Sequence, residues 1–516
     1  MGRSLTVVSA NVIQSLPIPA AFDSESLDRH FEVFSSQGKL YQSESQATTN
    51  GADIFRDTRA MEWIIGAGAN GYGALLQRSN YLFEAPLSYY TKTHKWELSP
   101  GYEDNDIGFS RTIQAGCISC HSGRAYPTDQ NTGRYTPTPF SETSIGCENC
   151  HGPGARHLLA VSRGGSLVDG PQIVNPGRLS SELENDICMS CHEAGDARVL
   201  KPGKTYQDFR PGTPLDDTFS ILMVPLKRDD ADDRDHVQHY FEMSMSKCFR
   251  ATAGQLRCAT CHDPHVEPSQ SEAPGFFNAK CAGCHTSRAC MLPLPARQQT
   301  KPADNCIGCH MPQREETETA HTSLTNHRIL MRQGEPWPEE AFQQTSASLP
   351  DLVHPNRDSS ETDEVPALTA LEAYREIAER KPEYAAAYQR TLSELERTDP
   401  DHAEVQLGLG KRELDSGNLQ QAVIQLRHAI QLDPDLGPPQ AYLSEALAQL
   451  NQLDDAIDAS EKAVSIDPFN PLFRKALIDR LIAAKRYDKA IAAMELYMEL
   501  FPEDNFMRKM LKIAQE

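Results

Sequence analysis

Twelve of the fourteen cysteines occur in six copies of one pentapeptide, Cys-x-x-Cys-His. The cysteines are Cys117, Cys120, Cys147, Cys150, Cys188, Cys191, Cys258, Cys261, Cys281, Cys284, Cys306 and Cys309. The histidines that close the motifs are His121, His151, His192, His262, His285 and His310. This spacing is the attachment sequence of c-type haem, in which two thiols bind one porphyrin and the histidine becomes the proximal iron ligand. We therefore predict six covalently bound c-type haems.

Two other uses of paired cysteines agree less well with this pattern. Zinc ribbons also contain Cys-x-x-Cys pairs, but they do not need a histidine after every second cysteine. A thioredoxin-like site needs one motif on a βαβ unit, whereas this chain has six motifs in sequence that is rich in loops.

The motifs are dense along the chain. All six lie within residues 117–310, which leaves about 32 residues for each haem. So little polypeptide cannot enclose each haem in its own pocket, so we expect the macrocycles to form much of the hydrophobic core. They must then lie close together, and electrons tunnel readily only between nearby rings. The motifs thus imply electron transfer, and redox catalysis at one haem is compatible with them.

Bis-histidine ligation of six irons needs six more histidines, and eleven remain outside the motifs. We interpret His354, in a polar stretch, and His402 and His428, in a helical repeat, as surface residues. Five others occur in three sequence contexts. Two follow a motif within a short Pro-containing segment, two flank the segment Thr-Ser-Leu-Thr-Asn, and one precedes the segment Met-Ser-Met-Ser-Lys that leads to Cys248. We predict that these five are distal ligands: His157, His239, His265, His321 and His327.

The sixth distal position has several candidates. His30, His94 and His236 compete for it. Ligation by Met243 or Met311 would raise the reduction potential of that haem. A haem with no sixth ligand would mark a catalytic site.

Two cysteines, Cys248 and Cys290, lie outside the motifs. Haem of this type is attached in an oxidising compartment, where two spare cysteines in one domain favour a disulfide. The alternatives are two buried free thiols or a thiolate haem ligand.

Composition excludes other classes of function. The 516 residues carry 72 acidic and 50 basic side chains, a formal net charge of -22, so nucleic acid and anionic lipid are not expected as main partners. With a mean hydropathy of -0.52 and no apolar run of the length that a bilayer requires, the chain is not an integral membrane protein.

A repeat of 34 residues occupies the C-terminal part. Pro400, Pro434, Pro468 and Pro502 recur at this interval, and Ala422, Ala456 and Ala490 share the period. Small residues where helices touch, with a proline after the second helix, are typical of the tetratricopeptide repeat. We predict three repeats that start near Ala403, Gly437 and Pro471. A degenerate helical pair at 366–400 precedes them, and a capping helix at 504–515 follows. Such a solenoid offers a surface for a partner or for self-association.

We therefore expect a mainly α protein of four segments. They are an N-terminal segment with short strands (1–115), a hexahaem cytochrome c domain packed around its haems (116–335), a polar linker (336–365) and a repeat domain (366–516). Strands are expected around residues 60–68 and 81–90, with a turn between them.

Two further motifs favour ordinary structure. The glycines Gly66, Gly68 and Gly71 match a dinucleotide-binding pattern, but the helix that such a site needs does not follow, so we expect tight turns against a haem face. The acidic run from Asp229 to Asp235 lacks the spacing of a calcium loop and is interpreted as a solvated loop.

The chain resembles a family of multihaem c-type cytochromes with C-terminal tetratricopeptide repeats, related to the tetrahaem electron carrier of nitrifying bacteria. The resemblance rests on EWIIGAGANGYG, YLFEAPLSYY, LSPGY, GCENCHGPGARH, IVNPGRL, ICMSCH, DFRPGTPLD, CATCHDPH, CIGCHMP and HTSLTNHRIL. It implies the same five distal histidines, and Cys248 and Cys290 as family features. The first twenty residues make a poor export signal, so either the signal is absent from this numbering or Met1 is an internal methionine. The resemblance implies the second, with a signal peptide and a seventh haem motif upstream of MGRSL.

We expect a periplasmic or extracellular electron carrier whose repeats dock a redox partner protein or join copies into an oligomer or filament. The alternative is a multihaem oxidoreductase that acts on a small nitrogen or sulfur compound at one five-coordinate haem. No motif has lysine in place of the proximal histidine, as the ammonia-forming nitrite reductases do. A scaffold with purely structural haems is the third hypothesis.

Overall fold

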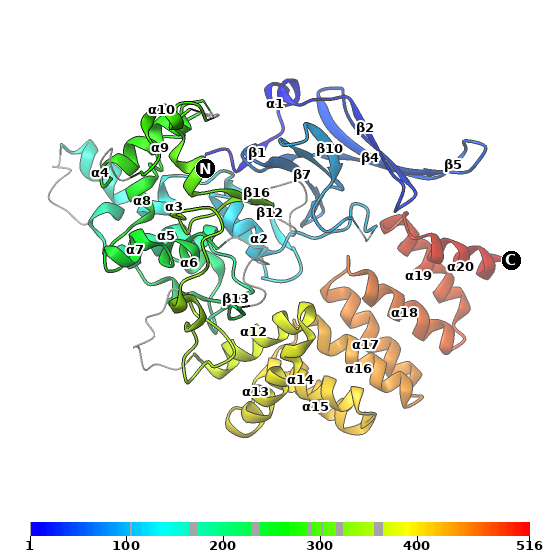
Figure 1. Ribbon diagram of the computed structural model, residues 1–516. Helices are drawn as coiled ribbons and strands as arrows, with labels where there is room; N and C mark the ends of the chain where they lie inside the picture. The colour runs from blue at the N-terminus through cyan, green and yellow to red at the C-terminus, as the bar shows by residue number, and fades with distance from the viewer. Residues whose placement is uncertain are drawn as a thin grey trace.

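The computed structural model describes residues 2–103, 106–164, 173–228, 238–269, 271–285, 290–300, 303–315, 323–355 and 365–516. Three parts follow one another along the chain (Figure 1). They are a strand-rich N-terminal part, a middle part of short helices that carry the Cys-x-x-Cys-His motifs, and a C-terminal helical solenoid.

Two antiparallel sheets form the N-terminal part. The first has the strand order β2-β3-β4-β5, and the second has the order β1-β6-β7-β9-β10 with β8 paired to β7. Phe31 and Val33 of the first sheet and Leu76 and Phe83 of the second are buried in one common core. The strands are β1 Leu5–Val7, β2 Ala20–Ser24, β3 Arg29–Ser36, β4 Lys39–Ala47, β5 Asp53–Met61, β6 Trp63–Ile65, β7 Gly71–Arg78, β8 Tyr81–Glu84, β9 Leu87–Tyr90 and β10 Lys95–Leu98, and helix α1 spans Ala10–Ser15.

The N-terminal part contains more strand than the small β-containing segment that we predicted. Polar residues hide the pattern, because Gln42, Ser43, Glu44 and Ser45 follow one another in β4 and are all buried. The side-chain amide of Gln42 donates to the carbonyl of Leu87 and accepts from its N–H, each at 2.9 Å, and so bridges the two sheets. Buried polar side chains that have partners leave no signal in hydropathy.

The glycines form a hairpin turn between β6 and β7. Gly66 and Gly68 have positive φ of 101° and 84°, and a Cβ on Gly71 would lie 2.3 Å from the carbonyl oxygen of Tyr89. A strand follows Gly71, so the predicted tight turns are confirmed. The turn packs against Tyr72 and Tyr89, and its contact with a haem face stays a prediction.

Short helices joined by three two-stranded ribbons make up the middle part. The helices are α2 Ala115–His121, α3 Cys147–His151, α4 Ala155–Ser162, α5 Ser181–His192, α6 His239–Ser244, α7 Lys247–Ala251, α8 Cys258–Cys261, α9 Ala273–Ala282, α10 Leu294–Arg297 and α11 Cys306–His310. The ribbons are β11 Arg124–Pro127 with β12 Tyr135–Glu142, β13 Ala197–Leu200 with β14 Phe219–Leu222, and β15 Gln313–Glu315 with β16 Ser323–Thr325.

The prediction of a polar linker is wrong for its first two thirds. Trp337, Leu349 and Leu352 are buried in the cores of the middle part, and Val353 pairs with Met223 as an isolated bridge. His354, which we interpreted as a surface residue, has a side chain only 6% exposed, with Nε2 3.1 Å from Asp216 Oδ1. Widely spaced apolar residues in an acidic sequence thus anchor this segment. Residues 356–364 lie outside the described part.

Nine helices of the described chain form the solenoid. They are α12 Ala367–Arg380, α13 Ala385–Thr398, α14 Ala403–Asp415, α15 Leu419–Leu432, α16 Gly437–Gln449, α17 Leu453–Ile466, α18 Pro471–Ala483, α19 Tyr487–Leu500 and α20 Asn505–Gln515. Helices α14, α16 and α18 begin at the residues that the 34-residue period predicts. Gly410 is required by close packing, since a Cβ there would lie 2.6 Å from Leu426 Cγ.

The first end of the solenoid packs on the middle part. Ala370, Tyr374 and Ile377 of α12 share a core with Val199 of β13 and Leu222 of β14. This contact is mainly apolar. The hydrophobic core of the middle part therefore extends into α12 and α13, the first helical pair.

The second end of the solenoid packs on the N-terminal sheets. Phe469, in the turn between α17 and α18, lies with its ring centroid 4.9 Å from those of Tyr81 and Phe83. The Arg78 guanidinium lies over the same ring at 5.1 Å. The chain therefore returns to its own N-terminal part, as the red helices beside β5 show in Figure 1.

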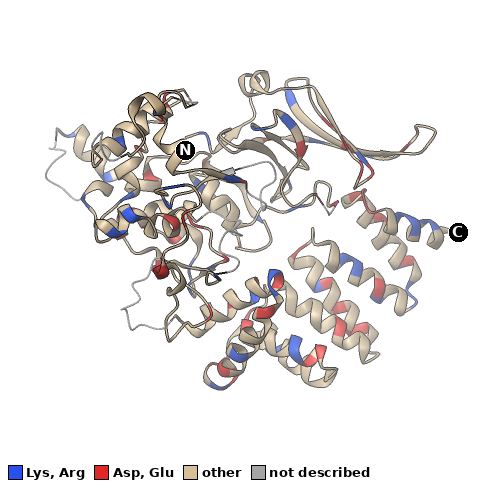
Figure 2. Ribbon diagram, in the orientation of Figure 1, with Lys and Arg blue, Asp and Glu red and all other residues tan. Residues whose placement is uncertain are grey.

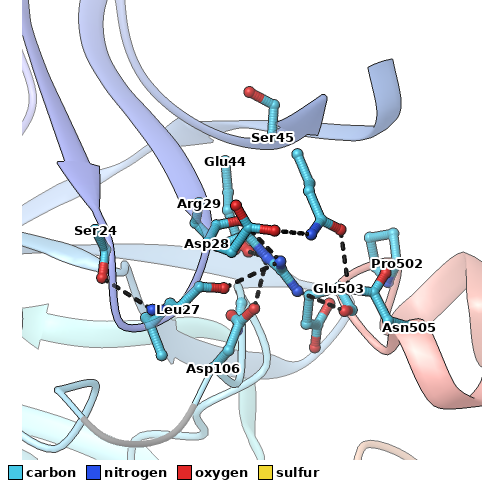
Figure 3. A network of polar contacts seen from close by, with 12 residues as sticks. Ser24, Leu27, Asp28, Arg29, Glu44, Ser45, Asp106, Pro502, Glu503 and Asn505 are labelled. Atoms are coloured by element: carbon cyan, nitrogen blue, oxygen red, sulfur yellow. Dashed lines mark hydrogen bonds and ion pairs between the residues drawn. The ribbon is translucent and has the colours of Figure 1, made fainter. Parts of the chain in front are cut away.

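A buried cluster around Arg29 completes this contact (Figure 3). Arg29 Nε lies 3.2 Å from Glu44 and 2.7 Å from Asp106, and its Nη2 donates to the carbonyl oxygen of Glu503 at 2.9 Å. Burial raises the pKa of Glu503 to about 8 and that of Glu44 well above its ordinary value, and the nearby Asp106 raises both. We call these four residues the Arg29 cluster. In it, two carboxyl groups, those of Glu44 and Asp106, face the guanidinium of Arg29, and Glu503 adds its main-chain carbonyl oxygen.

Charges of both signs alternate along the repeat helices (Figure 2). In the part of the chain that the structure describes, no helix has the length and apolar character to cross a bilayer.

We predict that the contact between solenoid and sheets weakens as the pH rises. The pKa of Glu503 is about 8 in the fold against an ordinary 4.5, so its stabilisation is complete below about pH 4.5 and is lost as the pH rises through 8. E503Q should therefore lose less thermal stability than wild type between pH 5 and pH 8. E499Q removes an exposed carboxylate nearby and should follow wild type. Equal pH slopes in all three proteins would contradict the prediction.

Candidate multihaem centre

Each motif begins in a helix that brings its two thiols to one side. Residues three apart are neighbours on a helix surface, so both cysteines of a motif face the same way. Helices α2, α3, α5 and α11 end at the motif histidine, whereas His262 directly follows α8. The fifth motif begins at the end of α9, and there the backbone N–H of His285 donates to the carbonyl oxygen of Cys281 at 2.8 Å. The local backbone thus suits covalent attachment at all six motifs.

The motifs lie next to one another. The Cys120 thiol of the first motif interacts with the Cys191 thiol of the third, and the Cys188 thiol of the third interacts with the Cys258 thiol of the fourth. The neighbouring Cys258 thiol and burial raise the pKa of Cys188. Arg198 Nη1 lies 3.3 Å from Cys120 Sγ and its Nη2 donates to Ser190 O at 2.8 Å, so this cation joins the first motif to the third. Haems attached here would lie side by side.

Two motif histidines are oriented by main-chain carbonyls. His151 Nδ1 lies 2.8 Å from Val174 O, and His310 Nδ1 lies 2.6 Å from Leu330 O. A carbonyl that accepts the Nδ1 proton leaves Nε2 unprotonated, and this is the arrangement usual for histidines that bind a metal.

Three predicted distal histidines lie opposite a motif histidine. The ring centroids are 6.0 Å apart for His151 and His265 and 5.5 Å for His192 and His239. They are 6.2 Å apart for His262 and His327. Two imidazoles on one metal should have centroids about 6 Å apart, because each metal–nitrogen bond is about 2 Å long. His239 and His327 are 4.2 Å apart, too close to share an iron.

The donor set fits haem iron. His239 Nε2 is buried and has no hydrogen-bond partner. Burial, reinforced by His327 and His192, lowers the pKa of His239 to about 2, and burial lowers that of His262 to about 4. These imidazoles are neutral, and the neutral form is the one that coordinates a metal. A buried nitrogen without a partner is costly unless a ligand occupies it.

The packing of this region also fits haem. Between residues 247 and 327, no described residue is buried, although three motifs lie there. Val266, Leu292 and Leu294 are exposed apolar residues in the same stretch. A large apolar group attached at the motifs would cover such side chains and supply the core that the polypeptide lacks.

The other candidate ligands have different surroundings. His157 lies on α4, beside the exposed Leu158, and no described motif histidine contacts its ring. His30 lies on β3 with Nδ1 2.7 Å from Asp23, and His94 lies in the turn after β9, 3.4 Å from the Tyr89 hydroxyl. His236, His321 and the acidic run from Asp229 lie outside the described residues.

The two spare cysteines lie beside different motifs. Cys248 is close to Cys284, and burial and then this neighbour raise the pKa of the Cys248 thiol. Cys290 is close to Cys306. Both are free thiols in the described structure. Their disulfide stays a prediction.

Sequence reasoning missed the charged residues that lie between the motifs. Arg198 contacts two motifs, and the buried Glu193 and Glu242 lie beside predicted ligands. Glu193 directly follows the third motif, a position that would have drawn attention to it. Glu242 carried no comparable signal, since only the fold brings it to His327.

Comparison with known proteins agrees with this geometry. A family model described as cytochrome c554 and c-prime matches residues 90–152, which contain the first two motifs, and a tetratricopeptide repeat model matches residues 443–470. The multiheme cytochrome MtrA of Shewanella baltica (strain OS185) is 25% identical over 183 residues, which is 33% of this chain and 52% of that protein. The chain spans about half the length of this curated relative. These matches support a multihaem c-type cytochrome with C-terminal tetratricopeptide repeats.

Solved structures are similar to a part of the chain. The crystal structure of MamA has a TM-score of 0.25 and 22% identity, and the match covers 27% of this chain and 81% of that chain. The Arabidopsis OM64 TPR domain has a TM-score of 0.21 and 20% identity, and the match covers 22% of this chain and 93% of that domain.

We predict that His265 is an iron ligand and that His30 is not. H265A should convert one haem of the oxidised protein from low spin to high spin, because the opposing imidazole is lost. H30A removes a histidine of the N-terminal sheet and should leave the spectrum unchanged. Electron paramagnetic resonance (EPR) of both variants at equal haem content measures this. A low-spin spectrum in H265A, or a high-spin signal in H30A, would be inconsistent with this assignment.

Proposed function

We propose that this protein is an exported cytochrome that carries electrons along six covalently bound haems, most of them ligated by two histidines. The observation that carries the proposal is the contact between neighbouring motifs, through the thiol pairs Cys120–Cys191 and Cys188–Cys258. Haem iron exchanges one electron at a time, and the chain supplies the ligands and the spacing.

The ring distances support a specific ligand assignment. We assign His265 to the iron of His151, His239 to that of His192, and His327 to that of His262. The short distance between His239 and His327 supports an arrangement in which the third and fourth haems are neighbours and their distal ligands are in contact. This contact favours transfer between these two centres.

The repeats suggest how the protein meets its partners. Tetratricopeptide repeats present extended surfaces for other proteins, so we propose that this domain docks a redox partner protein or joins copies into an oligomer or filament. Since c-type haem is attached outside the cytoplasm, a periplasmic or extracellular location follows from the motifs.

One observation keeps a catalytic alternative open. Among the described residues, His121, His285 and His310 have no second imidazole opposite them. A five-coordinate haem at one of these motifs would make the protein a multihaem oxidoreductase for a small nitrogen or sulfur compound.

Spectroscopy of the mature protein separates the two functions. Mass spectrometry should find six haems attached to the chain, and EPR of the oxidised protein should show low-spin iron almost throughout. Fewer than six attached haems would contradict the hexahaem proposal. A full equivalent of high-spin iron that binds nitrite, hydroxylamine or sulfite would favour the oxidoreductase. C309S serves as the control for haem counting. It removes one attachment thiol of the sixth motif and should disturb the haem of that motif alone.

A further inference from the structure

Four histidines stand in a row in the centre of the middle part. Their order is His192, His239, His327 and His262, with successive ring centroids 5.5, 4.2 and 6.2 Å apart. Two of them, His239 and His327, are the assigned distal ligands of adjacent haems. Small displacements of these rings would change both the iron ligation and the contact between the ligands.

A buried glutamate stands at the first step of the row. Glu193 directly follows His192 and is 0% exposed. Its Oε2 accepts the backbone N–H of Tyr240 at 2.8 Å, and its backbone pairs with Gln238 as an isolated bridge. The residues on both sides of His239 are therefore attached to the residue that follows the proximal ligand.

A second buried glutamate stands at the next step. Glu242 lies three residues after His239 on α6 and is 1% exposed. Its Oε2 accepts the backbone N–H of His327 at 2.8 Å, and its Oε1 forms an ion pair with Arg314. Arg314 lies on β15, in the ribbon whose partner strand β16 ends two residues before His327.

The ring of His327 is held from its other side as well. Its Nδ1 lies 2.8 Å from Thr325 O, so the Nε2 atom is left for the metal. The carboxylate of Glu242 thus connects the helix of one distal ligand to the main chain of the next. A buried carboxylate is costly, and here Arg314 and the amide of His327 compensate for it.

We propose that Glu193 and Glu242 are positioning residues that set the ring positions of the two contacting distal ligands. This inference rests on the proposed function, because it assumes that His239 and His327 bind haem iron. It goes beyond the ligand assignment, since it explains why two acidic residues are buried among neutral imidazoles. Glu242 makes the decisive contact, because its side chain joins α6 to the main chain of His327.

The reach of the Glu242 side chain provides the test. In E242Q the amide oxygen can still accept the N–H of His327, so we expect the low-spin EPR spectrum of wild type. In E242D the side chain is one methylene shorter, and we expect a high-spin component from one haem although the charge is kept. Haem content, measured by pyridine haemochrome, should be unchanged in both. A wild-type spectrum in E242D, or an E242Q spectrum altered as strongly as that of E242D, would overturn the proposal.

Two controls separate this inference from the ligand assignment. Glu340 is 57% exposed and pairs with Arg250 at 2.7 Å, so E340D and E340Q should both be silent. H327A should produce high-spin iron. If H327A stays low spin, the ligand assignment itself fails. If H327A becomes high spin while E242D does not, only the positioning role fails. If E242D does not mature with haem, E242Q decides, and a high-spin signal in it would refute the proposal.

Discussion

One stretch of the middle part, residues 247–327, depends on one constraint, which is that the described polypeptide there forms no hydrophobic core by itself. From residue 247 to residue 327 no described residue is buried, yet the backbone forms ordered motif helices there. An apolar group joined covalently to the chain would resolve this, since its burial would stabilise the fold while the fold fixes its position. The density of motifs, the short helices and the exposed apolar side chains all follow from it.

The same constraint governs the polar residues of the middle part. Neutral imidazoles such as His239 need a partner when they are buried, and a metal can be that partner. The carboxylates of Glu193 and Glu242 accept hydrogen bonds from main-chain N–H groups beside these rings, so the acidic groups stabilise the backbone there. A redox centre with several irons close together would need such rigid spacing.

The solenoid is fixed at both ends by different interactions. Its first helices share an apolar core with β13 and β14, whereas its last turn meets the N-terminal sheets through Phe469 and the Arg29 cluster. A repeat domain attached at two places does not swing freely about a linker. Any partner that binds the repeats is therefore held at a defined position relative to the haem-binding part.

Local patterns determined much of this protein from sequence alone. The six motifs, the three repeats and the turn at Gly66 depend on spacings within a few residues or within one period, so they can be read without the fold. Long-range packing decided the rest. Buried polar strands such as β4, the burial of His354, the opposition of His265 to His151 and the contact of Glu242 with His327 join residues far apart in the chain. No local pattern records which distant partner satisfies a polar group, and for that reason only the tertiary structure could reveal these contacts.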